Sequence, residues 1–137
     1  MDSEKDFRNV NLGCTAQEVI SSEKFELSQG DPNKDSTLLI YKDVEIDGNK
    51  VNISYNITNG TFQNGIIIYS PDDSQAFFDG LKERMVQRHG DDYISFFTTY
   101  LKWNTGEKCY ELYLMENGRI AYSVMTKEYS DMLDNHK

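Results

Sequence analysis

Apolar and polar residues alternate strictly along 50–58, and this alternation is the clearest pattern in the chain. Successive side chains of a β-strand point to opposite faces of a sheet, so a period of two predicts a strand with one packed and one wet face. Such a strand is typical of antiparallel sheets. The apolar positions are Val51, Ile53, Tyr55 and Ile57, and the polar positions are Lys50, Asn52, Ser54, Asn56 and Thr58.

Two-residue turn signals separate runs of β-forming residues at three places: Asp47-Gly48, Asn59-Gly60 and Asn117-Gly118. Type I′ turns need positive φ at both central residues, and these pairs adopt it with little strain. Each signal therefore predicts that its flanking strands pair antiparallel. Strands are expected over 38–46, 50–58, 61–69, 93–103, 108–116 and 119–126, with a bulge at Asn64-Gly65.

Two segments carry helical signals. Thr15-Ala16-Gln17-Glu18 matches a capping box and predicts a short helix over 15–23. Pro71-Asp72-Asp73-Ser74 places acidic residues at the start of a second helix over 74–89, which Gly90 would end. The apolar stripe of this helix consists of Phe77, Phe78, Leu81, Met85 and Val86.

These elements predict an α+β domain in the order (β)αβββαβββ, where the first β is a short edge strand or extended lead-in at 7–12. We expect a mostly antiparallel sheet of about six strands with both helices on one face, which would bury both apolar stripes. A chain of 137 residues suits one domain, 1–137. Its polar lead-in, 1–6, and its tail, 127–137, with one helical turn followed by disorder, are expected to be flexible.

The net charge of the chain limits the classes of partner that it is expected to bind. With 23 acidic and 14 basic residues the net charge is −9, which argues against nucleic acid and anionic membrane surfaces as partners. A basic protein partner is compatible with this charge, and so is a surface that is simply well solvated. No apolar run reaches the roughly 20 residues of a membrane-spanning helix.

The usual catalytic groups are sparse. The cysteines are Cys14 and Cys109, expected to be free thiols, and the only bases for a Cys–His pair are His89 and His136. Asp43-x-Glu45-x-Asp47-Gly48 resembles the start of a calcium loop but has Ser54 where the bidentate Glu would stand. There is no glycine-rich phosphate loop. We therefore expect no catalytic residue, no metal and no cofactor.

Aromatic residues offer a candidate interaction surface. If Phe97, Leu101 and Trp103 face the helices, their neighbours face the other way, and the same period places Tyr110, Leu112 and Leu114 inward. Exposed aromatic and Met clusters mark interfaces. The alternatives are that this face is covered by the tail, by the loop at 24–36 or by a second copy of the chain. The candidate surface consists of Phe96, Tyr100, Tyr113, Met115 and Met125.

The segment 12–19, Leu-Gly-Cys-Thr-Ala-Gln-Glu-Val, resembles the opening of small bacterial cell-envelope domains with a Gly-x-Thr/Ser-x-x-Glu/Asp-Val signature. The β-lactamase-inhibitor-protein-like domains and the outer-membrane-assembly lipoproteins of the SmpA/OmlA type share this opening. The resemblance implies a non-enzymatic, protein-binding domain outside the cytoplasm. The matching positions, Gly13, Thr15, Glu18 and Val19, are structural in that family.

Three functions are therefore expected, in this order. The first is a non-catalytic protein-binding domain of a bacterial cell-envelope or secreted protein, with its signal segment removed from this chain. The second is a cytosolic acidic inhibitor or immunity-type protein that neutralises a basic enzyme, for which Met1 would be native. The third is a small hydrolase. The sequence does not identify the partner protein, and it is also compatible with a homodimer.

Overall fold

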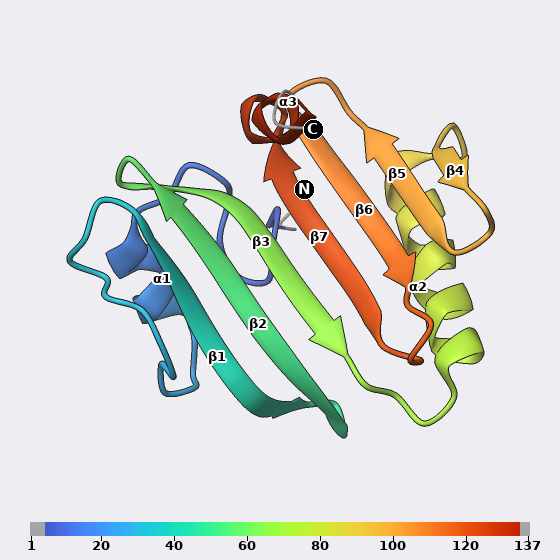
Figure 1. Cartoon of the computed structure of the whole chain (residues 1–137), viewed down its shortest axis with the longest axis horizontal. Coiled ribbons are helices and arrows are strands. Elements are labelled where there is room, and N and C mark those ends of the chain that lie inside the picture. The colour runs from blue at the N-terminus through green and yellow to red at the C-terminus, as the bar shows by residue number, and fades with distance from the viewer. Residues whose placement is uncertain (1–4, 135–137) are drawn as a thin grey trace.

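The strands of the chain form one antiparallel sheet in the computed structural model, which describes residues 5–134. The sheet order is β1-β2-β3-β7-β6-β5-β4, and every neighbouring pair is antiparallel (Figure 1). This confirms the α+β, antiparallel class. Within the described range the elements are α1 (Ala16–Ser22), β1 (Thr37–Ile46), β2 (Asn49–Thr58), β3 (Thr61–Tyr69), α2 (Ser74–His89), β4 (Ile94–Phe96), β5 (Tyr100–Asn104), β6 (Lys108–Leu114), β7 (Ile120–Thr126) and α3 (Lys127–Asp134).

One face of the sheet, here called the inner face, carries the core. Figure 1 shows α1 behind the β1–β2 side of the sheet and α2 behind the β4–β6 side. Val19 of α1 and Phe78 of α2 belong to the same buried cluster as the inward side chains of the strands. The predicted placement of these two helices on one face is therefore observed. The most deeply buried strand residues include Leu39, Ile53, Tyr55, Ile57, Phe62, Leu112, Ile120 and Val124.

Local capping explains where α1 and α2 begin. The Glu18 N–H donates to Thr15 Oγ1 at 3.2 Å, and the Thr15 N–H donates to Glu18 Oε1 at 3.0 Å. At α2, Asp73 Oδ1 accepts the Ala76 N–H at 3.1 Å, and Gly90 ends the helix with φ +91°. Both helices lie within a residue of their predicted bounds because these signals are local.

Two of the three predicted type I′ turns are observed. Asp47 and Gly48 have φ of +51° and +82°, and Asn59 and Gly60 have +51° and +83°. At the third site only Gly118 has positive φ, and the loop closes through the Met115 N–H donating to Arg119 O at 2.8 Å. The type I′ prediction was wrong at this site. Strands β6 and β7 still pair antiparallel, because a longer loop with Gly in the left-handed region also joins a hairpin.

The predicted strand at 93–103 is in fact a hairpin. β4 and β5 pair through Ile94–Lys102 and Phe96–Tyr100, with Phe97 at φ +56° in the turn. The turn contains no Gly, Asn or Pro, so the sequence carried no signal for it. The described residues therefore form seven strands instead of about six, and Phe97 is 91% exposed instead of facing the helices.

The segment at 7–12 is not an edge strand but crosses the inner face. It forms a single bridge between Phe7 and Val10, and the Phe7 ring lies where a side chain on Gly65 would be, 2.6 Å from its ideal Cβ. Asp6 is buried, accepts Lys108 Nζ at 2.6 Å and accepts the Leu12 N–H at 2.9 Å. The expected polar lead-in is thus anchored at its sixth residue, while 1–4 lie outside the described residues.

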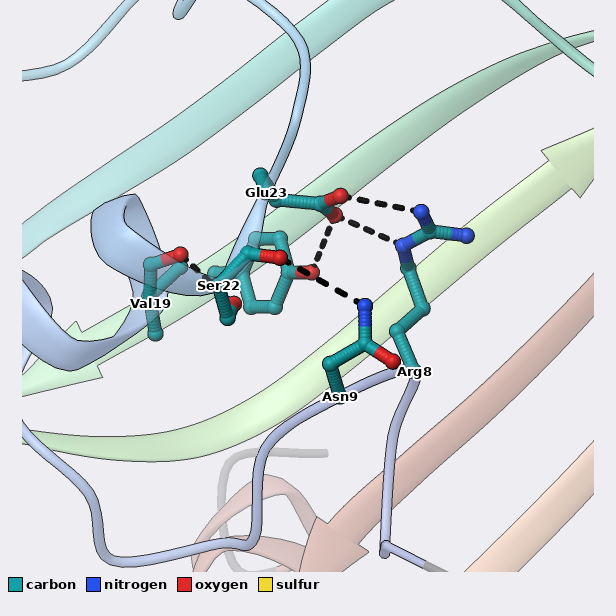
Figure 2. A network of polar contacts seen from close by, with 6 residues as sticks. Arg8, Asn9, Val19, Ser22 and Glu23 are labelled. Atoms are coloured by element: carbon teal, nitrogen blue, oxygen red, sulfur yellow. Dashed lines mark hydrogen bonds and ion pairs between the residues drawn. The ribbon is translucent and has the colours of Figure 1, made fainter.

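A buried polar network joins this segment to α1 and β2 (Figure 2). Glu23 accepts Arg8 Nε at 2.6 Å and Arg8 Nη2 at 2.9 Å, and it also accepts the hydroxyl of Tyr55. Burial lowers the pKa of Arg8, but the hydrogen bond and charge of Glu23 outweigh it, so the net pKa is raised. Arg8 adopts φ +53°, a left-handed conformation that this network stabilises.

The tail is more ordered than expected. Residues 127–134 form an eight-residue helix, α3, and it lies across the end of β7 on the face opposite α1 and α2 (Figure 1). Tyr129 Oη accepts Asn56 Nδ2 at 3.2 Å, and Ser130 Oγ accepts Lys102 Nζ at 3.3 Å. The tail thus contributes a third helix among the described residues, and 135–137 lie outside them.

Candidate functional site

The outward face of β4–β7 and one side of α3 enclose a groove of about 1130 Å³. We call it the aromatic groove. Phe96, Tyr100 and Tyr113 occupy directly paired positions on β4, β5 and β6. Their rings are 5.6 Å and 5.7 Å apart between centroids. All five residues of the predicted surface line this groove: Phe96, Tyr100, Tyr113, Met115 and Met125.

These five residues differ in exposure. Phe96 is 54% and Tyr113 is 38% exposed, while Tyr100 and Met115 are half-buried. Met125 is only 4% exposed, because it shares a small hollow with Tyr129 and Leu133 of α3. The expectation that Met125 is exposed was wrong. Covering by the tail, one of the alternatives considered above, therefore applies at the α3 end of the face.

Four further apolar residues line the groove, and the sequence interpretation did not place them there: Ile94, Phe97, Leu114 and Leu133. Leu114 was expected to face inward, and it is half-buried at the edge of the groove. Ile94 could have been found, since it lies two residues before Phe96 and shares its face. Leu133 lies four residues after Tyr129, a helical spacing that a longer predicted tail helix would have revealed. Phe97 could not be found, because its exposure depends on the unsignalled turn.

The polar groups of the groove give it an acidic character. Its lining holds three carboxylates, those of Glu111, Glu116 and Asp134, and one amine, that of Lys102. Lys102 Nζ lies 3.9 Å from Glu111 Oε2. Burial, and then hydrogen bonding with Glu111, raises the pKa of Tyr100, so its phenol stays protonated at neutral pH. A cationic ligand would suit this lining better than an anion.

Cys14, Cys109 and His89 lie in surroundings that do not suit a Cys–His pair, and His136 lies outside the described residues. Both cysteines are free, as expected. Burial, and then the charge of Glu18, raises the pKa of Cys14 to about 11, which is the opposite of what a nucleophilic thiolate needs. Cys109 is buried and its Sγ donates to Asn104 Oδ1 at 3.0 Å. The His89 ring stacks on Tyr110 with centroids 4.0 Å apart.

The acidic run on β1 does not form a metal centre. A bulge follows Tyr41, where Asp43 has φ +53° and its N–H donates to Asn52 Oδ1 at 2.9 Å. Between residues 5 and 134, no three His, Cys, Asp or Glu side chains are placed to hold a metal ion together. None of the helices in that same range is long and apolar enough to cross a membrane.

Comparisons of this chain with models of protein families, with curated proteins and with solved structures gave no match in any of the three.

Proposed function

We propose that this chain is a non-catalytic protein-binding domain, and that its aromatic groove takes up a basic, amphipathic segment of a partner protein. One observation carries the proposal. Among the described residues seven large hydrophobic side chains are exposed, and five of them line this one groove: Ile94, Phe96, Phe97, Tyr113 and Leu133. Scattered exposed apolar residues need no explanation, but a cluster in a concave site is typical of a binding surface.

The chemistry of the cluster suits protein recognition. Phe and Tyr side chains bury large areas with few rotatable bonds, and aromatic residues are enriched at the centres of interfaces. Phe97 is held at positive φ with 91% of its surface exposed, so the fold presents this ring at a conformational cost. Strained residues of this kind cluster at ligand-binding sites.

Charge defines the partner more closely. The chain carries −9, and the groove has three carboxylates against one amine. A second copy of the chain would bring the same negative charge to this surface, which disfavours a homodimer through the groove. A partner segment with Lys or Arg beside apolar side chains satisfies both the carboxylates and the rings. Neutralisation of a basic enzyme, the second expected function, would use the same chemistry.

The proposal can be tested with a library of displayed peptides selected on the whole protein. We expect the selected peptides to combine aromatic or aliphatic residues with Lys or Arg. Phe97→Ser should weaken their binding by tenfold or more, as loss of a central aromatic anchor does. Leu38→Ser is the matched control, because Leu38 is 46% exposed on β1, away from the groove, and its loss should leave binding unchanged.

Three results would count against the proposal. Peptides that bind Phe97→Ser as well as the wild type would place recognition elsewhere on the surface. If raising the salt concentration from 50 to 300 mM abolished binding, and Phe97→Ser did not affect it, recognition would depend on charge alone. Turnover of a substrate that is lost on changing Cys14 or His89 would instead favour the third expected function, a hydrolase.

A further inference from the structure

The two edges of the sheet differ in how their backbone groups are bonded. β1 forms one edge and β4 forms the other (Figure 1). At β1, the Ile40 N–H donates to Gln29 O at 2.9 Å, and Ile40 O accepts the N–H of Ser28 at 2.9 Å. The Lys42 N–H donates to Ser28 Oγ at 3.0 Å. The loop before β1 therefore already pairs with the middle of that edge.

The edge at β4 has no such cover from the described part of the chain. Between residues 5 and 134, no backbone hydrogen bond joins Ile94–Phe96 to any segment other than β5. All residues of β4 are exposed, with Ile94 at 49% and Phe96 at 54%. The N–H and C=O groups on the open side of an edge strand are a template for pairing with another strand. The sheet can therefore be extended at β4.

Given the protein-binding role proposed above, we infer that the partner segment binds as an extended strand that pairs with β4 and widens the sheet. Alternate side chains of this strand then lie on the outward face beside Ile94 and Phe96, both of which line the aromatic groove. Side chains directly opposite each other on paired strands are about 4.5–5.5 Å apart. The added strand thus continues the row of rings formed by Phe96, Tyr100 and Tyr113.

Charge around β4 selects the side chains of the added strand. Asp91 and Asp92 are the only charged residues in 91–99, and both are exposed. The aromatic groove adds three carboxylates and one amine to the same region. Lys or Arg residues in the added strand are therefore favoured over Asp or Glu. The expected segment alternates apolar residues, which face the groove, with basic residues.

The shortness of β4 determines how the added strand gains its affinity. β4 has three residues, so it can form few main-chain hydrogen bonds with a new neighbour. Side chains in the groove must therefore supply most of the affinity, while the main-chain bonds fix the direction and register of the segment. Pairing of two copies through β4 is disfavoured, because each copy carries −9 and few bonds are available to offset the repulsion.

The test uses two synthetic peptides of identical composition, Lys-Phe-Lys-Val-Lys-Ile-Lys and Lys-Lys-Phe-Val-Ile-Lys-Lys, titrated into the whole protein at physiological salt. Only the first peptide places all of its apolar side chains on one face of a strand. We expect this alternating peptide to bind about tenfold more tightly than the other. With the alternating peptide at saturation, hydrogen exchange should slow at one or more amides of 94–96. Exchange at Ile40, already bonded to Gln29, should be unchanged.

Single N-methyl groups along the alternating peptide test the main-chain pairing directly. In a strand that pairs on one side only, every second N–H points toward the neighbouring strand. Methylation of such a nitrogen removes one hydrogen bond and should weaken binding about threefold to tenfold. Methylation at the positions between should change the affinity much less, so the losses should alternate along the peptide.

Strand addition is overturned if the two peptides bind equally, if the N-methyl effects do not alternate, or if exchange at 94–96 is unchanged in the complex. If binding is nevertheless weakened by Phe97→Ser, the groove remains a protein-binding site and only the strand geometry fails. If no peptide binding depends on Phe97, the proposed function fails as well. A free protein that sediments as a dimer with protected amides at 94–96 would assign the edge to a second copy and also overturn the inference.

Discussion

Strands β2 and β6 both alternate buried inward residues with outward residues, but they differ in their outward chemistry. Their inward residues are equally buried, as Tyr55 and Leu112 illustrate at 0% exposure each. The outward residues of β2 are Asn52, Ser54 and Asn56, whereas β6 presents Tyr113, which is 38% exposed. Inward residues are determined by the core, while outward residues are free to vary. An aromatic residue at an outward position is therefore compatible with the binding role proposed above, and it also forms a cross-strand pair with Tyr100.

The outward asparagines of β2 serve neighbouring elements. Asn52 Oδ1 accepts the N–H of Asp43 in the β1 bulge, and Asn56 Nδ2 donates to Tyr129 of α3. Tyr113 contacts another ring of the groove, that of Tyr100. The β1–β2 side of the outward face is thus structural and polar, and the β4–β6 side is open and aromatic.

The largest expected effect is the difference in stability between truncating an inward residue and truncating an outward residue of β6. Leu112→Ala should lower the free energy of unfolding by about 2–5 kcal/mol, because it leaves a cavity in a packed core. Tyr113→Ala should cost about 1 kcal/mol or less, since its ring is partly solvated and packs only on one side. Urea unfolding of the two variants measures the difference. Equal losses would mean that both faces of β6 are packed and that the aromatic groove is core.

An intermediate effect is expected from the polar network above β2. Glu23→Gln removes the charge that pairs with Arg8 and should lower the free energy of unfolding by about 2–3 kcal/mol, because a partly buried guanidinium loses its counter-charge. The Glu23 side chain is 1% exposed and that of Arg8 is 17% exposed. Chemical unfolding of the variant tests this value.

Asp131→Asn is the matched control for Glu23→Gln. It breaks the Lys127–Asp131 pair, whose 3.0 Å separation is similar but whose side chains are 61% and 57% exposed. Exposed pairs contribute little, so this variant should unfold like the wild type. Similar losses for Glu23→Gln and Asp131→Asn would show that burial of the Glu23 network does not matter for stability.

The smallest effect is a change in the pH dependence of stability. Burial, and then hydrogen bonding with Glu23, raises the pKa of Tyr55. Above about pH 10 an unfolded tyrosine loses its proton while folded Tyr55 keeps it, so the folded state binds more protons and stability falls as pH rises. Tyr55→Phe should reduce this fall by about 1.4 kcal/mol per pH unit. Urea unfolding at pH 8 to 11 measures it, and identical slopes would contradict the prediction.

Most of the helix ends, turns and strand faces that were predicted correctly depend on signals between residues close together in the chain. The Thr15–Glu18 capping box and the Asp47-Gly48 turn act within a few residues, and both are observed where they were expected. The acidic run at 71–74 predicted the start of α2, and the structure shows that Asp73 caps it. The alternation along β2 identified its buried face for the same reason. The turn at Phe97 was missed because the neighbouring residues include no turn former, and the pairing of β4 with β5 imposes it.

Sequence patterns alone account for the antiparallel class, for the two helices of the inner face and for the outward placement of Phe96, Tyr100 and Tyr113. These follow from periodicity and short-range hydrogen bonding. Packing and charge pairing beyond the local segment are needed to explain why α3 covers Met125 and why Glu23 meets both Arg8 and Tyr55. The contacts of Glu23 join residues 15 and 32 positions apart, and α3 forms against the sheet beyond the end of β7. Their free energy comes from burial and charge pairing with other elements, which no short segment contains.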